Sequence, residues 1–154
     1  MKTKNSVSIV ALRHSIVLIA TFVLSSSAHA QKTYGDRAFE GDTVCVVINH
    51  VKADKRQQFE HFVHDLIADQ MNKLGPEEQA MSQHVRVLHP VHQEKDSTYT
   101  YIFIMDPVIP GADYRTASVL GKLYDPQKIA EYSKMFGDSK AAPSTLYICV
   151  QSRH

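Results

Sequence analysis

The stretch TVCVVINHVKADKRQQFEHFVHDLIADQMNKLGP, residues 43–76, predicts a strand followed directly by a long helix. Its first part, Thr43–Val51, is rich in β-branched side chains, which favour extended backbone. After Asp54, apolar side chains recur every three or four residues, which indicates a helix with one buried face. That apolar stripe consists of Phe59, Phe62, Val63, Leu66, Ile67, Met71 and Leu74.

The ends of this helix also carry recognisable signals. Asp54 and Gln57 have the spacing of a capping box, in which each side chain accepts a backbone hydrogen bond from the other end of the first turn. Gly75 and Pro76 predict the stop, because glycine tolerates the left-handed cap and proline cannot continue the helix.

The rest of the chain predicts two strands, a weaker helical stretch, a second helix and a last strand: Gln83–Val91, Thr98–Met105, Tyr114–Leu123, Asp125–Gly137 and Ser144–Gln151. Asp125 and Pro126 have the cap and first-turn preferences of a helix start. The element order is then β-α-β-β-α-β, so we expect a ferredoxin-like α+β domain.

The strands predict how this domain assembles. Two helices cover only one face of a four-stranded sheet, yet three strands are apolar on both sides: 44–48, 101–105 and 146–150. A second face left in water would expose a large apolar patch, which soluble monomers avoid. We therefore expect a homodimer in which two sheets meet face to face and form an α/β barrel.

Residues 1–30 have the three parts of a secretory signal peptide. An apolar run, Ser15–Leu24, precedes a small-residue cleavage pattern at Ala28 and Ala30, and the basic residues before it are Lys2, Lys4 and Arg13. The run of about ten residues is much shorter than the roughly 20 needed to span a membrane. We expect an exported protein, periplasmic or secreted, with a flexible lead-in at residues 31–42, a domain at 43–154 and no membrane attachment after cleavage.

Charge argues against a nucleic-acid partner. The chain has 17 basic and 16 acidic residues, and loss of residues 1–30 leaves 14 against 16. Nucleic-acid binders need a basic surface to displace counterions. The 124 residues that remain suffice for one domain with one core.

Cys45 and Cys149 lie near the middle of the first and last strands, which are antiparallel neighbours in this topology. An oxidising compartment permits a disulfide between them. Two buried free thiols are the alternative, since free cysteine is common in protein cores. The sequence leaves both open, because strand register cannot be read from it.

The segment Val51–Phe59 (VKADKRQQF) resembles the strand-to-helix junction of the dimeric α/β-barrel superfamily, and it is most similar to the antibiotic-biosynthesis-monooxygenase-like branch. Members of that branch commonly have Val-Lys-Pro-Gly-Lys there, whereas this chain has Ala53-Asp54 in place of Pro-Gly. The resemblance implies a dimer with a ligand pocket between the sheet and the second helix. It also implies either a cofactor-independent oxygenase of aromatic compounds, a quinol oxygenase, a haem-degrading enzyme or a protein without catalysis. The chain has no Trp, and residues 114–136 contain no His to bind haem, so we expect no cofactor.

Several side chains could serve a pocket. His50, at the end of the first strand, could act as a proton-transfer base, or simply be a hydrogen-bonded histidine at a strand end. The expected ligand-contacting residues are Asn49, Arg86, Tyr99, Tyr101, Phe103 and Tyr114. The aromatic members could alternatively belong to the dimer core, and Arg86 could keep an edge strand soluble.

Other histidines are weak metal signals. His61 and His64 are three residues apart on the polar side of the long helix, and a third protein ligand would be needed. His89 and His92 flank a proline at a strand end. A solvated helix face and a surface turn explain both pairs, so no metal site is expected.

Two functions remain open at this point. One is an enzyme that acts on a small aromatic compound, with His50 as the base. The other is a non-catalytic exported protein that holds a small apolar ligand or has a stress-associated role. Fold resemblance alone cannot choose between them.

Overall fold

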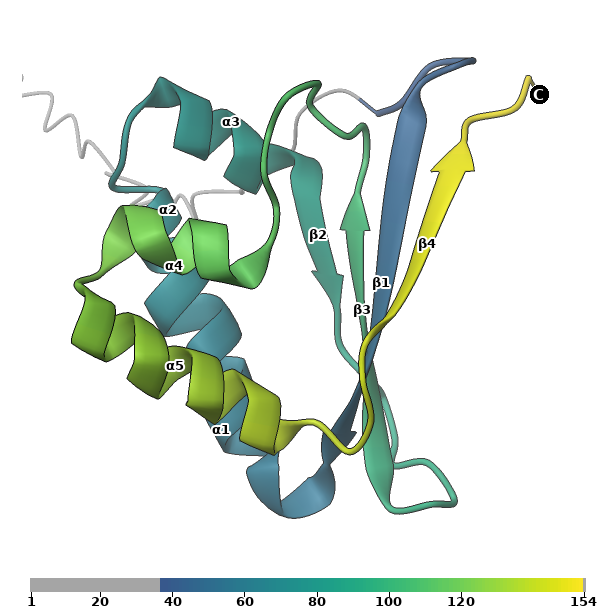
Figure 1. Ribbon diagram of the computed structural model, residues 1–154. Coiled ribbons are helices and arrows are strands. Elements are labelled where there is room, and N and C mark those ends of the chain that lie inside the picture. The colour runs from purple at the N-terminus through teal and green to yellow at the C-terminus, as the bar shows by residue number, and fades with distance from the viewer. Residues whose placement is uncertain (1–36, 154) are drawn as a thin grey trace, which may run out of the picture. The chain divides into compact units, whose positions relative to one another are not determined.

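The computed structural model describes residues 37–153, so the predicted signal peptide and the first half of the lead-in lie outside the described residues. The elements are β1 (Thr43–Lys52), η1 (Ala53–Lys55), α1 (Arg56–His61), η2 (Phe62–Ala68), α2 (Asp69–Met71), α3 (Pro76–His84), β2 (Val85–Leu88), β3 (Thr98–Met105), α4 (Thr116–Leu123), α5 (Pro126–Ser139) and β4 (Thr145–Val150). The sheet is antiparallel with strand order β2-β3-β1-β4, and the helices lie on one side of it (Figure 1). The predicted ferredoxin-like α+β class is confirmed. Within residues 37–153, no helix combines the length and the apolar character that crossing a membrane requires.

The long first helix is present, but its winding differs from the prediction. The apolar stripe is buried at Phe59, Phe62, Val63 and Met71, as expected. The predicted capping box is wrong: Asp54 lies inside the 3-10 turn η1, and no side-chain cap bond forms at the start of either η1 or α1. The helix then winds as a π-helix through η2, a form that is rare and is found frequently at functional sites.

Residues 76–84 were not expected to be helical. Gly75 does end the first helix region, but Pro76 begins a further helix, α3, with Glu77 and Glu78 in its first turn. Proline at the first helical position and acidic residues near the N-terminus both favour a helix start. The predicted strand at Gln83–Val91 is consequently only four residues long, β2.

The later elements agree closely with the sequence analysis. β3 has the predicted bounds, and Asp125 caps α5 by accepting a hydrogen bond from the Lys128 backbone N–H at 3.0 Å. The helix runs two residues past Gly137, because that glycine does not adopt the left-handed conformation that ends a helix.

One face of the sheet packs against the helices. The residues of β1 and β3 that share this face are paired across the strands, with Asn49 opposite Tyr101 and Val51 opposite Tyr99. The main core is formed by buried residues of this face and of the helices: Val51, Phe59, Phe62, Val63, Tyr101, Leu120 and Tyr132. The long helix supplies three of them, so its predicted stripe is the centre of the core.

The other face has no helix over it among the described residues, as Figure 1 shows. We call it the open face. By the strand register it carries Val44, Val46, Ile48, His50, Arg86, Leu88, Thr100, Ile102, Ile104, Thr145, Tyr147 and Cys149. The prediction that helices leave one apolar face uncovered is confirmed.

The strand register also determines whether Cys45 and Cys149 can form a disulfide in this structure. Cys45 is opposite Ile148, and Cys149 is opposite Val44, so the two thiols point to opposite faces of the sheet. Both are free. The disulfide that the topology allowed is therefore not formed, because the strands are offset by one residue from the register it needs.

Candidate functional site

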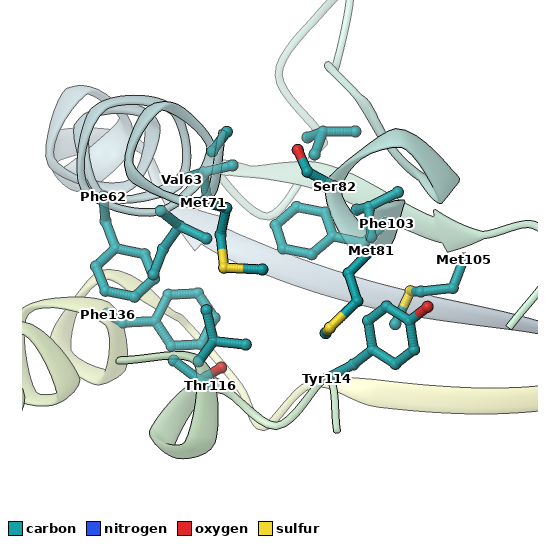
Figure 2. A pocket seen from close by; sticks show the side chains of 15 residues that line it. Phe62, Val63, Met71, Met81, Ser82, Phe103, Met105, Tyr114, Thr116 and Phe136 are labelled. Atoms are coloured by element: carbon teal, nitrogen blue, oxygen red, sulfur yellow. The ribbon is translucent and has the colours of Figure 1, made fainter. Parts of the chain in front are cut away.

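A cavity of about 150 Å³ lies between the sheet and the helices. Its lining residues are Phe62, Val63, Ile67, Ala68, Met71, Met81, Ser82, Val85, Val87, Phe103, Met105, Tyr114, Thr116, Val119 and Phe136. Figure 2 shows three methionines and three phenylalanines directed toward the same space. Methionine is flexible and polarisable, so such a wall can adapt to the shape of an apolar guest.

Elements far apart in the sequence build this wall. The π-helical segment η2 contributes four lining residues, and α3 contributes Met81 and Ser82. The sheet forms the floor through Val87 on β2 and Phe103 on β3, which are directly paired. The amphipathic stripe of the first helix therefore has two roles, because Phe62 and Val63 belong to the core and also line the cavity.

The cavity has few polar groups. Ser82 and Thr116 each offer a hydroxyl, and Tyr114 offers a phenol whose oxygen accepts a hydrogen bond from the Ile109 backbone N–H at 3.2 Å. Burial raises the pKa of Tyr114 above its ordinary value. No lining residue is an Asp, Glu, His, Lys, Arg or Cys, so the wall is uncharged near neutral pH. Such a site suits a neutral apolar guest with at most a hydroxyl or carbonyl group.

Only two of the predicted ligand-contacting residues line this cavity, Phe103 and Tyr114. Tyr99 and Tyr101 share the helix-covered face with Phe103, but they pack within the core nearer the start of β3. The aromatics of β3 accordingly do not lie on the open face, where the dimer core was the alternative expectation. The alternation of side chains along a strand shows which residues share a face, but it does not show which face the helices cover.

Asn49 is fully buried on the helix-covered face. Its Oδ1 accepts a hydrogen bond from the Ser144 hydroxyl at 2.6 Å, and Ser144 in turn accepts one from Lys140 Nζ at 3.1 Å. Its Nδ2 has no protein partner. These two hydrogen bonds connect β1 to the segment that leads into β4.

His50 and Arg86 lie on the open face, opposite the cavity. The His50 Nδ1 is 3.2 Å from the Thr100 hydroxyl, across the β1–β3 pair. Arg86 pairs with Asp106, a mostly buried carboxylate just after β3. The structure does not bring His50 together with the aromatic residues that were expected to accompany it.

A polar cluster lies on the helix side, where α1 meets β3. Glu60 accepts hydrogen bonds from the Tyr101 hydroxyl and from Arg56 Nε, the latter at 3.0 Å. Burial acts to raise the pKa of Glu60, but these two donors outweigh it and the pKa is lowered. Burial and the bond to Glu60 raise the pKa of Tyr101 to about 12. The cluster therefore holds an ionised carboxylate against a neutral phenol.

Two histidines continue this cluster outward. His64 Nε2 lies 3.0 Å from His89 Nε2, and the two rings are stacked 5.0 Å apart. His89 also approaches Glu60, with its Nδ1 3.6 Å from the carboxylate. Partial burial and the proximity of His89 lower the pKa of His64. His61 is not part of this cluster, and its Nδ1 lies 2.6 Å from the Asp65 carboxylate.

Sequence reasoning missed the parts of these sites that depend on α3 and on Glu60. Met81 and Ser82 lie in a stretch that had no assigned element, although the Gly75-Pro76-Glu77-Glu78 run contains a helix-start signal as well as a stop signal. Glu60 was not singled out from the sequence. No local pattern indicated that it would meet Tyr101, 41 residues away.

No family model and no curated protein matches this chain. Among solved structures, it is similar to one described as a putative antibiotic biosynthesis monooxygenase from Caulobacter crescentus. The two share 13% identity with a TM-score of 0.41, over 75% of this chain and 94% of the other. That description names the same branch that Val51–Phe59 resembles. At this level the likeness concerns the fold, and the activity in the description belongs to the other protein.

Proposed function

We propose that this is an exported protein that binds a small, neutral, apolar or aromatic compound in the cavity between the sheet and the helices. The observation that carries the proposal is the cavity itself: about 150 Å³, walled by methionine and aromatic side chains and free of charged groups. Closely packed cores leave few voids larger than a water molecule. A space of this size within a 117-residue described region is therefore a candidate binding site rather than a packing fault.

The size of the cavity selects the ligand. An apolar protein cavity of about 150 Å³ stays dry and takes a guest the size of benzene. Tyr114, Ser82 and Thr116 supply the only lining hydroxyls, so a ligand with one hydroxyl or carbonyl group would find a partner. A single-ring phenol or a comparable neutral compound fits both the volume and the chemistry.

The wall favours binding over catalysis. Proton transfer needs a group whose pKa lies near the working pH, and Tyr114 is the one lining side chain that titrates. Burial raises the pKa of its phenol, which removes it further from neutrality. His50, the side chain predicted as the base of such an enzyme, lies on the opposite face of the sheet.

The proposal includes a homodimer formed by the open faces of two copies. Leu88 and Tyr147 are exposed there beside the apolar residues of β1 and β3. Covering them removes apolar surface from water, which favours association by roughly 25 cal/mol per Å² before the cost of association. The cavity lies on the helix side, so each copy keeps its own site.

Export is supported by residues 1–30, whose basic, apolar and small-residue segments follow the order of a signal peptide. An exported binder of small compounds would meet its ligand outside the cytoplasm. N-terminal sequencing of the protein purified from periplasm or medium would show a start at Gln31, and a start at Met1 would contradict this part.

Binding can be measured directly with simple probes. We expect toluene and phenol to bind one per chain in calorimetry, and naphthalene and benzoate to bind at least tenfold more weakly. Naphthalene exceeds the volume, and benzoate would bring an unpaired charge into an apolar wall. Met81→Trp, which fills the cavity, should abolish binding of both single-ring probes.

Tyr114→Phe and His50→Ala separate specificity from catalysis. Tyr114→Phe should weaken the binding of phenol by about fivefold, which corresponds to the loss of one hydrogen bond, and should leave the affinity for toluene unchanged. His50→Ala should change neither affinity, because His50 lies on the other face. Failure of every single-ring probe to bind the wild-type protein would refute the proposed site. Oxygen consumption with phenol that disappears in His50→Ala would show an enzyme instead of a binder.

A further inference from the structure

We propose that His64 and His89 form a binding site for a divalent transition metal, with Cu²⁺ as the best-suited ion. The two Nε2 atoms face each other at 3.0 Å, although one residue is in η2 and the other is in the loop after β2, 25 positions later. This site lies outside the apolar cavity, since neither histidine lines it. The proposal is independent of the proposed ligand-binding function.

The separation of the two nitrogens indicates which metal geometry fits. Imidazole nitrogens bind metals at roughly 2.0–2.1 Å. Two such bonds to atoms 3.0 Å apart enclose an angle of about 95° at the metal. Adjacent ligands in a tetragonal complex are about 90° apart, whereas tetrahedral ligands are about 109° apart. Tetragonal nitrogen and oxygen sites are typical of Cu²⁺ and Ni²⁺, and Cu²⁺ binds more tightly in the general order of affinities.

The surroundings hold His89 in place for this role. Its ring is stacked on His64 and lies edge-on to Tyr101, with ring centres 5.3 Å apart. Its second nitrogen, Nδ1, lies 3.6 Å from the Glu60 carboxylate. This distance is too long for a hydrogen bond, but the negative charge of Glu60 still favours a cation on the neighbouring ring. Glu60 is itself held by hydrogen bonds from Tyr101 and Arg56.

The electrostatics and exposure also suit a cation. Glu60, Asp65 and Asp69 act on His64 with negative charge, and Arg56 is held by Glu60 on the core side of the cluster. The His89 side chain is 42% exposed. Water can therefore complete the coordination. No group of three or more His, Cys, Asp or Glu within residues 37–153 is arranged for a metal, so the protein would supply two ligands and leave the others open.

A direct hydrogen bond between the two rings is the competing explanation of the 3.0 Å contact. One neutral imidazole would donate and the other would accept. The two explanations differ in what they require at position 64. Glutamine retains an amide that can hydrogen-bond to His89, but it is a poor ligand for Cu²⁺. His64→Gln therefore preserves the hydrogen bond and removes the metal site.

The experiment is a Cu²⁺ titration of the full processed chain without an affinity tag, with glycine as a competing chelator. We expect one Cu²⁺ per chain and an electron paramagnetic resonance spectrum of tetragonal type with coupling to two imidazole nitrogens. His64→Gln, His64→Ala and His89→Ala should each weaken binding at least tenfold. His61→Ala and His92→Ala are matched controls, since both are neighbouring surface histidines, and should stay within twofold.

The outcomes are decisive in both directions. Loss of binding in the three site variants, with folding unchanged by circular dichroism, supports the site. Equal Cu²⁺ affinity in wild-type protein and His64→Gln, or loss in the control variants instead, overturns it. Absence of any Cu²⁺ binding by the wild-type protein also overturns it. Binding of toluene or phenol is measured separately, so failure of either proposal leaves the other standing.

Discussion

β1 and β4 are paired neighbours of similar apolar composition, yet they have opposite environments. Val51 on β1 is 0% exposed, whereas Val150 on β4 is 66% exposed and every residue of β4 is exposed. β1 lies inside the sheet with α1 packed on it, while β4 is an edge strand that extends beyond the helices (Figure 1). Hydrophobicity therefore identified both strands but did not determine which one the core would use.

The largest expected effect comes from making the same substitution in both strands. Val51→Ala should lower the free energy of unfolding by about 2–3 kcal/mol, because two buried methyl groups are lost and a cavity remains. Val150→Ala should change it by at most about 0.5 kcal/mol, as is usual for exposed positions. Urea unfolding at a protein concentration where the chain is monomeric measures both. Equal losses would mean that β4 is covered in the single chain.

The next effect tests what covers the open face. Tyr147→Glu places a charge within the proposed dimer interface, on the edge strand β4. We expect this variant to be monomeric, and the wild-type protein dimeric, in size-exclusion chromatography with light scattering. Val91→Glu, at an exposed position between β2 and β3 and outside the strands that carry the open face, is the control and should remain dimeric. Cys149, on the same face, should alkylate more slowly in the dimer than in Tyr147→Glu. A wild-type monomer at micromolar concentration would remove the dimer.

The last test concerns the helix-covered face and measures how stability depends on pH. Tyr101→Phe should cost about 1.5–3 kcal/mol at pH 7, because its hydroxyl donates to an ionised carboxylate. The folded-state pKa of Tyr101 is about 12 against an ordinary 10, so the unfolded chain loses its proton first and stability falls as the pH rises from about 10 to 12. That fall should be smaller in Tyr101→Phe, and the remainder comes from Tyr114 and Tyr124, whose pKa values burial also raises.

Glu60 gives the acidic counterpart of this test. Its folded pKa is below the ordinary 4.5, so its contribution is present above about pH 4.5 and is lost as the pH falls further. In Tyr101→Phe one of its two donors is missing, and the loss of stability in acid should become smaller. A pH–stability profile unchanged by the substitution would show that the Tyr101–Glu60 bond contributes nothing.

Much of the fold could be predicted because its signals are local. The bounds of Thr98–Met105, the Asp125 cap and the buried stripe of the first helix depend on side-chain chemistry within a few residues. α3 was missed because Pro76 was interpreted only as the end of the first helix, whereas proline is also favoured at the first position of a helix. The capping box failed at Asp54 because a 3-10 turn replaced the first helical turn.

The candidate sites were less predictable for a physical reason. Phe103 and Tyr114 were identified as pocket residues, and both line the cavity. His50 and Arg86 were grouped with them, but strand alternation places them on the other face. The pairing of His64 with His89 joins two segments whose separate sequence patterns gave only weak metal signals.

By itself, the sequence determined the order and type of most elements, the apolar character of both sheet faces and the segments that resemble a signal peptide. Each of these follows from residues close together in the chain. The tertiary structure alone decided which face the helices cover, the one-residue offset between Cys45 and Cys149, and the meeting of Glu60, Tyr101 and the two histidines. These depend on register and packing between distant segments, where a shift of one residue turns every side chain of a strand to the other face.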